Sequence, residues 1–434
     1  MTNSASDDTA PEVTISGLGS EGDGVGRLAD GRVVFVAGAL PGDRVRIALG
    51  PTYKRVQYAD VLRIIEPSPE RIRSRCQVVD CGGCSLRILS MAGQREAKRH
   101  RVVQAMRRLG GVDVEDLVGP VVGEGDGWAY RHRVRFHAAW RDHQWRLGYH
   151  ARRSKKLAPL SACTVLWPEL EAAALRLAEA LAKLPENARL KEVQLAYSRR
   201  DGRAAAVVRG DGLLKAYRRA WDWFEDSGLS GVEIQLPASR FRFGNLELRY
   251  DHGRADHFDL RFEPDVFTQA NPQINDRLVE AVSLAVRPRE GPSVLELHAG
   301  IGNFSLPLAL SGARITAVET NQRAVLLSRR NAGIHGVDTR IIQETDARAV
   351  TQLAPLNTFD VALLDPPRSG AREAVTAFAT EGPTRIVYVS CDPATLARDI
   401  GLLQGGGYRL THMQAFDMFA QTPHVEIVAQ LSRQ

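Results

Sequence analysis

The sequence predicts a multi-domain protein with a small N-terminal β-barrel, a central α+β domain and a C-terminal α/β domain of the Rossmann-like kind. A chain of 434 residues is long for one domain. Short apolar runs between glycine-rich turns fill its first part, whereas helix and strand patterns alternate from about Glu263 to the end. We therefore place the domains at residues 11–68, 69–262 and 263–434.

The N-terminal domain contains four short apolar runs that are typical of strands: Val13–Ile15, Val33–Val36, Arg44–Ile47 and Ala59–Leu62. Turns rich in glycine separate them, notably Gly17–Gly19 and Gly22–Gly26. Several short strands with such turn signals predict a small barrel.

The central domain carries a cluster of cysteines. Cys76, Cys81 and Cys84 lie close together, and two glycines between the last two allow a tight loop. A closed site needs a fourth thiolate, and Cys163 is the remaining candidate once Cys391 is set aside for catalysis. Four thiolates suit zinc or an iron–sulfur cluster, and the residue types alone do not distinguish the two.

Two basic stretches follow the cysteines. Residues 94–110 have helical spacing, end at a glycine pair and carry several basic side chains. We interpret them as a helix that packs on the C-terminal domain and has one solvated basic face, with RNA contact as the alternative. Residues 128–156 interleave arginine and lysine with aromatic residues, which predicts contact with phosphates and unpaired bases of RNA.

Two polar motifs in the C-terminal domain end apolar runs that are typical of buried parallel strands. Val361–Leu364 leads into Asp365, and Ile386–Val389 leads into Ser390 and Cys391. In an open α/β sheet, ligands bind at the carboxyl ends of such strands. A carboxylate and a thiol are therefore expected at neighbouring strand ends.

The last two strand patterns, at residues 408–416 and 425–431, are too close in sequence for a crossover helix. They predict an antiparallel hairpin. Its second strand begins at the sheet edge where the parallel strands end, so we expect Glu426 near Asp365 and Cys391.

Residues 294–304 are typical of a strand, a glycine-rich turn and a helix. Gly300 and Gly302 allow a ligand to approach the backbone closely. Glu319, at the end of the next strand, stands where a carboxylate binds ribose hydroxyls. The third glycine of a dinucleotide fingerprint is replaced by Ser305.

The composition is that of an ordinary globular protein. Its net charge of +6 weakly favours binding to a polyanionic partner. We find no secretory signal and no apolar run long enough to cross a bilayer. We expect a cytoplasmic monomer with no membrane association, in which clustered cysteines indicate metal binding or catalysis rather than disulfides.

Together these motifs resemble the RNA uracil-5-methyltransferase family, which makes 5-methyluridine in ribosomal or transfer RNA from S-adenosyl-L-methionine. The likeness covers nearly the whole chain and rests on the glycine turn, the cysteines, and the motifs Phe267–Asn271, Asp365–Arg368, Ser390–Pro393 and His424–Glu426. It favours the branch with a TRAM domain and an iron–sulfur cluster, typified by 23S ribosomal RNA enzymes. It implies a TRAM barrel, a central iron–sulfur domain and a class I methyltransferase domain.

The resemblance also implies roles for individual residues. Cys76, Cys81, Cys84 and Cys163 match the ligands of the family's [4Fe–4S] cluster, although this chain has four residues between the first two cysteines where the family often has five. The positions expected to bind S-adenosyl-L-methionine are Gln269, His298, Gly300, Asn303, Glu319, Asp346 and Asp365. His298 stands where the family commonly has an aromatic ring, and a surface turn is the alternative for Asp346.

Methylation at uracil C5 requires a thiolate that adds to C6 and a base that later removes the C5 proton. Cys391 is the expected nucleophile and Glu426 the expected general base, with Asp365 orienting the uracil or the methyl donor. The alternatives are a buried inert cysteine and a surface glutamate at a strand edge. Because the target base must reach a pocket at the strand ends, we expect an extruded nucleotide.

Other functions remain as alternatives. A transfer RNA uracil-5-methyltransferase would use the same motifs, and a non-catalytic RNA-binding or chaperone protein could keep the same architecture. Enzymes that methylate exocyclic amines place an aromatic residue after the proline pair, where this chain has Arg368. Cytosine-5 enzymes place a cysteine beside their proline motif, and none stands there.

Overall fold

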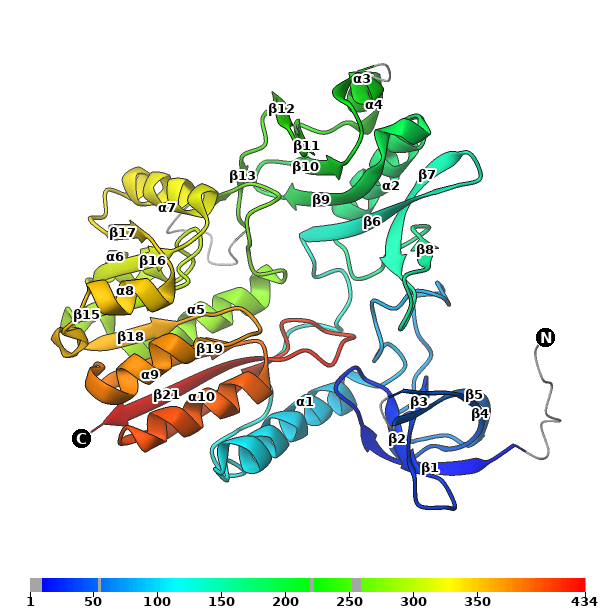
Figure 1. The fold of residues 1–434 in the computed structure, drawn as a ribbon, viewed down its shortest axis with the longest axis horizontal. Helices are drawn as coiled ribbons and strands as arrows, with labels where there is room; N and C mark the ends of the chain where they lie inside the picture. The colour runs from blue at the N-terminus through cyan, green and yellow to red at the C-terminus, as the bar shows by residue number, and fades with distance from the viewer. Residues whose placement is uncertain (1–9, 54–55, 219–221, 252–258, 434) are drawn as a thin grey trace.

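The computed structural model describes residues 10–53, 56–218, 222–251 and 259–433. The chain forms a small barrel, a central mixed sheet and a C-terminal parallel sheet covered by helices (Figure 1). Helix α1 (Met91–Ala105) runs between the barrel and the C-terminal domain. Within the described ranges, no helix has both the length and the apolar character that a bilayer span requires.

The N-terminal barrel confirms the sequence prediction. It closes in the order β1-β2-β3-β5-β4. The strands are β1 (Glu12–Leu18), β2 (Gly24–Arg27), β3 (Val33–Ala37), β4 (Arg44–Tyr53) and β5 (Val56–Glu66). Alternate side chains, such as Val34, Val36 and Val45, fill the interior and are fully buried.

The central sheet has the order β12-β11-β10-β9-β6-β7-β8. Its strands are β6 (Arg133–Arg141), β7 (Gln144–His150), β8 (Leu157–Pro159), β9 (Leu190–Ser198), β10 (Arg203–Gly210), β11 (Gly231–Leu236) and β12 (Ser239–Gly244). Helix α2 (Pro168–Ala182), with Pro168 in its first turn, packs its apolar stripe on this sheet. Short helices α3 (Leu214–Arg218) and α4 (Asp222–Ser227) follow, and β13 (Leu248–Arg249) pairs with β14 (Arg261–Phe262).

The C-terminal sheet has the order β17-β16-β15-β18-β19-β21-β20, and only β21 runs antiparallel to its neighbours on both sides. Its strands are β15 (Ser293–Leu297), β16 (Arg314–Glu319), β17 (Arg340–Gln343), β18 (Val361–Leu364), β19 (Arg385–Ser390), β20 (Tyr408–Phe416) and β21 (Glu426–Arg433). The helices are α5 (Pro272–Val286), α6 (Ser305–Leu310), α7 (Gln322–His335), α8 (Asp346–Gln352), α9 (Arg372–Glu381) and α10 (Pro393–Gly405). The predicted hairpin of the last two strands is confirmed.

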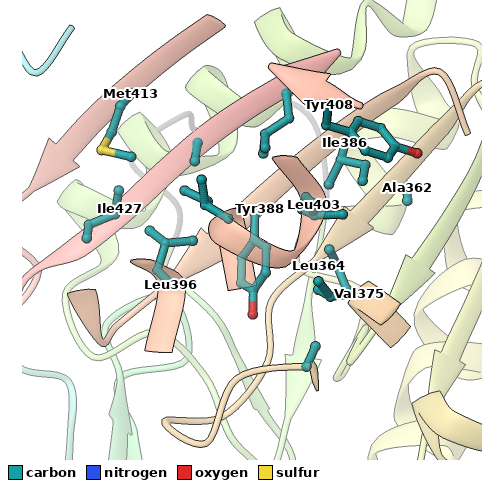
Figure 2. Packing of buried hydrophobic residues seen from close by; sticks show 14 of the residues in the cluster. Ala362, Leu364, Val375, Ile386, Tyr388, Leu396, Leu403, Tyr408, Met413 and Ile427 are labelled. Carbon is teal, nitrogen blue, oxygen red and sulfur yellow. The ribbon is translucent and has the colours of Figure 1, made fainter. Parts of the chain in front are cut away.

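Both faces of this sheet are buried, which explains the continuous apolar runs in the sequence. Along β18, Ala362 and Leu364 point to one layer while Val361 and Leu363 point to the other. The first layer contains α9 and α10, and Figure 2 shows residues of β18, β19, β20 and β21 packed there against Leu396 and Leu403 of α10. The other layer contains α5 and α6.

The basic helix packs on the C-terminal domain, as predicted. Val102, Val103 and Met106 share one buried cluster with Ile400 of α10. A π-helical turn, Met106–Gly110, ends the helix. The prediction of a solvated basic face is wrong at Lys98, whose side chain is 1% exposed and forms an ion pair with Asp417.

Arg152 and Arg153 join the central domain to the barrel. Arg152 lies 2.6 Å from Asp23, and Arg153 pairs with the same carboxylate while its guanidinium stacks on Tyr58 at 4.1 Å. The Asp23 side chain is 3% exposed. The structure therefore assigns this arginine pair to the interface between barrel and central domain, where the sequence analysis expected contact with RNA.

Replacing Asp23 with alanine tests this interface. Removing one partner of a buried pair costs about 3–5 kcal/mol, and we expect about 1–3 kcal/mol here because both arginines keep some exposure. Denaturant unfolding measures the loss, and limited proteolysis should release the barrel sooner. Asp30→Ala is the control because Asp30 and its partner Arg32 are both about half exposed; an equal loss in both variants contradicts the assignment.

Candidate active site and four-cysteine site

The sheet topology brings three predicted catalytic residues to one edge. Asp365 follows β18 and Cys391 follows β19, and these strands are parallel neighbours with Leu364 paired to Tyr388. Strand β21 lies antiparallel on the other side of β19, with Ile427 opposite Ser390. Glu426 therefore begins its strand beside the residue that follows Ser390, which is Cys391.

Burial raises the pKa values of the ionisable groups at this edge. The Glu426 side chain is almost fully buried, and burial raises its pKa well above the ordinary value, as does the nearby Asp365 carboxyl. Burial also raises the pKa of Asp365 to about 7, with Glu319 adding to the rise and His298 opposing it. The pKa of Cys391 is raised to about 12, by burial first and then by Glu426 and Asp365. The thiol is therefore protonated at neutral pH and needs an acceptor for its proton before it can attack.

Arg368 and His424 border this edge. Arg368 Nη2 lies 3.1 Å from His424 Nε2. Burial, followed by the charges of Arg368 and Arg101, lowers the pKa of His424 to about 4. A neutral imidazole can accept a hydrogen bond from the guanidinium, which leaves Arg368 as a cation near Glu426.

A cavity next to Asp365 brings together five of the seven residues expected to bind the methyl donor. It is lined by Leu260, Phe267, Thr268, Gln269, His298, Ala299, Gly300, Ile301, Asn303, Phe304 and Asp365. Glu319 accepts a hydrogen bond of 2.9 Å from the Gly300 amide, so the carboxylate at the end of β16 is held beside the glycine turn. A methyl group added to Gly300 would meet open space, as expected for backbone that faces a ligand. Gln269 Oε1 is buried and has no hydrogen-bond partner among the described residues, which leaves an acceptor for a ligand.

The remaining predicted donor-binding residues are held by other side chains. His298 Nε2 lies 3.4 Å from Asp346 Oδ2, and this contact lowers the pKa of Asp346. Asn303 and Asn275 exchange two amide hydrogen bonds of 2.8 and 3.0 Å. Asn303 thus lines the cavity, while its amide is directed at α5.

The sequence analysis did not single out Glu296 of β15. Its carboxyl is fully buried, Ser305 donates a hydrogen bond to it, and burial raises its pKa to about 8. Asp365 and Glu319 contribute to this rise, so Glu296 belongs to the same group of acids. A glutamate inside an otherwise apolar strand was the signal that could have identified it.

The four predicted metal-ligating cysteines line one cavity in the central domain, together with Arg87, Arg131 and Tyr149. The thiols are free, and among the described residues no group of side chains is already arranged as a metal-ligand set. Burial raises the pKa of Cys84 to about 12 and that of Cys163 to about 11. Gly82 is required in this loop because a methyl group there would lie 2.8 Å from backbone atoms of the chain after β7.

The fold and the edge site define a class of protein, an S-adenosyl-L-methionine-dependent methyltransferase with an added barrel of the RNA-binding kind. Comparison with known families agrees. Residues 252–434 match the family described as tRNA (Uracil-5-)-methyltransferase, and residues 11–62 match the TRAM domain.

Curated relatives match over nearly the full chain. A Dichelobacter nodosus protein named 23S rRNA (uracil(1939)-C(5))-methyltransferase RlmD is 34% identical, covering 98% of this chain and 99% of its own. One of the same name from Alkalilimnicola ehrlichii is 36% identical, covering 98% and 96%. The Pyrococcus abyssi tRNA (uracil-54, C5)-methyltransferase, solved with S-adenosyl-L-homocysteine, superposes with a TM-score of 0.76 at 27% identity, covering 97% and 99%. The chain belongs to the RNA uracil-5-methyltransferase family.

Asp365→Asn should stabilise the ligand-free protein at high pH. The folded-state pKa of about 7 exceeds the unfolded value near 3.8, so the folded state binds this proton more tightly. Wild-type stability therefore falls as pH rises between these values, whereas asparagine does not titrate. The gain in melting temperature should be larger at pH 8 than at pH 5. The exposed Asp338→Asn should show no such trend, and a gain that does not change with pH would contradict the burial of a protonated Asp365.

Proposed function

We propose that this protein transfers the methyl group of S-adenosyl-L-methionine to C5 of a uridine in RNA, and that its substrate is 23S ribosomal RNA. The observation that carries the proposal is the placement of Cys391 and Glu426 at one sheet edge by strands β19 and β21. The names of the full-length relatives support ribosomal RNA. Transfer RNA is the second candidate, because the solved relative acts on transfer RNA.

Each residue has a distinct part in the reaction. The thiolate of Cys391 adds to C6 of the uracil, which makes C5 nucleophilic, and C5 then forms a bond to the methyl carbon as the carbon–sulfur bond of the donor breaks. Glu426, as carboxylate, removes the C5 proton, and the electrons of that bond expel Cys391 from C6. Asp365 lies beside both groups and orients the base or the donor. When bound, S-adenosyl-L-methionine supplies the methyl group, and Gln269, Gly300 and Glu319 are the residues we assign to hold it.

We also propose that Cys76, Cys81, Cys84 and Cys163 hold a [4Fe–4S] cluster. Four thiols around one cavity supply the required ligand chemistry, and the neighbouring Arg131 and Arg87 offset negative charge on thiolates. The loop between Cys81 and Cys84 contains the glycine that its packing requires. We assign the cluster a role in ordering the central domain, and we place the enzyme in the cytoplasm with its RNA.

Two variants should separate the catalytic roles. With Cys391→Ala no covalent complex with RNA forms and no methyl is transferred. With Glu426→Gln the addition and the methyl transfer proceed, but the C5 proton stays, so turnover should fall by about 10²–10⁴-fold. Methylated RNA then remains joined to Cys391. A denaturing gel with labelled methyl detects this adduct as a slow band, and normal turnover by Glu426→Gln would refute its role as base.

The cluster proposal predicts brown protein after purification without oxygen, with about four irons and labile sulfide per chain. Cys84→Ser should lose iron and destabilise the central domain, because metal binding is coupled to folding. Cys391→Ser is the matched control and should keep its iron. Colourless wild-type protein with one zinc would refute the cluster.

A further inference from the structure

The connection between β20 and β21 comprises nine residues, 417–425. It begins directly after the cross-strand partner of Glu426 and ends directly before Glu426 itself. Phe416 pairs with Glu426, and Asp417 follows Phe416 directly. The position of the connection therefore bears on where β21 begins. In Figure 1 it extends from the sheet toward α1 and the central domain.

Gln94, Lys98 and Arg101 of α1 bind this connection from one face of the helix, and Arg95 adds a longer contact of 3.9 Å to Asp417. Gln94, Lys98 and Arg101 are spaced by four and three residues, which places them on one stripe. The Lys98 ammonium pairs with Asp417 and donates to the Phe419 carbonyl at 3.0 Å. Arg101 donates to the Pro423 carbonyl at 2.8 Å.

Gln94 binds the middle of the connection. Its amide exchanges two hydrogen bonds with Gln421, of 2.9 Å between the side chains and 2.8 Å from the Gln421 backbone. The Tyr130 hydroxyl donates to the Ala420 carbonyl at 3.1 Å. The connection is thus held near both ends and at its centre by a segment that lies roughly 300 residues earlier in the chain.

The contact between Lys98 and Asp417 is buried, with the two side chains 1% and 2% exposed. A buried ion pair is a weak source of stability, because desolvation offsets most of the attraction. It is directional, however, and any other arrangement of the connection would leave one charge buried without its partner. The pair therefore fixes the geometry of the connection more than it stabilises the fold.

We propose that Lys98 is a positioning residue for catalysis, which holds residues 417–425 so that Glu426 reaches the C5 proton of the methylated uracil; Gln94 and Arg101 assist it from the same face of α1. This inference rests on the proposed function. Lys98 touches neither reacting group and acts through Asp417 and the strand pair that it borders. The basic residues of α1 on this stripe therefore act on the active site indirectly, through residues 417–425.

The test follows a single turnover with labelled methyl and measures how fast the covalent methylated adduct breaks down. Lys98→Met should slow this breakdown by about 10–10²-fold, because a small misplacement of a catalytic group has that effect. The methyl-transfer step and the affinity for S-adenosyl-L-methionine should change much less. Arg108→Met, an exposed basic residue just beyond α1, is the matched control and should behave as wild type.

Two further variants keep the test decisive if Lys98→Met folds poorly. The double variant Lys98→Met/Asp417→Leu removes both charges of the buried pair. It should therefore retain a melting temperature near the wild-type value and still show slow adduct breakdown. Arg101→Met removes the contact at Pro423, together with a charge that lowers the pKa of His424, and should slow breakdown several-fold. Breakdown at the wild-type rate in both, or fewer active molecules with an unchanged rate, overturns the proposal. Absence of methyl transfer by wild type and Arg108→Met alike would instead refute the proposed function.

Discussion

The arrangement of the active site depends on one antiparallel strand in an otherwise parallel sheet. Parallel strands deliver residues to the ligand-binding edge only at their carboxyl ends. Strand β21 runs the opposite way between β19 and β20, so it delivers its first residue, Glu426, to the same edge. The proposed nucleophile and the proposed base can then lie next to each other, although Cys391 follows the end of one strand and Glu426 begins another.

This placement has an electrostatic consequence. Glu426, Asp365 and Glu296 are acidic groups in a region of low polarity, and their pKa values rise because none has a close cation to offset burial fully. A raised pKa makes the carboxylate form of an acid a stronger base, which suits a reaction in which a proton must leave Cys391 and a second must later leave C5. The pKa of Asp365 near 7 allows that group to exchange a proton at neutral pH.

Much of the fold and the edge of the site could be predicted from local patterns. Apolar runs of four to six residues that end in Asp365 or Ser390 predict strand ends, and the short separation of the last two strands predicts their hairpin. Contacts between distant segments could not be predicted. The pairing of Asn303 with Asn275 depends on how α5 packs beside the glycine turn, and that of Arg152 with Asp23 depends on how two domains meet. Nothing in either segment alone specifies the partner.

The same limit explains why basic residues were misread as candidates for RNA binding. Arg131 and Arg133 are partly buried, and Arg133 donates to the Val266 carbonyl at 2.7 Å, next to the segment that carries Gln269. A guanidinium has five donors, so it can satisfy several buried carbonyls that an aliphatic residue would leave unpaired. From the sequence alone, such an arginine cannot be distinguished from one that binds a phosphate of RNA.

Hydrogen bonds connect the four-cysteine site to the segment that precedes Glu426, although the two sites are far apart in sequence. Leu86 follows Cys84 by two residues, is fully buried, and donates its amide to the Gln421 carbonyl at 2.9 Å. Gln421 also donates to the Gly127 carbonyl at 3.2 Å. The cysteine loop and the chain leading to β6 therefore both form hydrogen bonds with the connection before Glu426. A cluster bound by Cys84 would fix the nearby backbone at Leu86, which donates the hydrogen bond to this connection. The proposed cluster would in this way influence the proposed proton removal at C5 without exchanging an electron with the substrate.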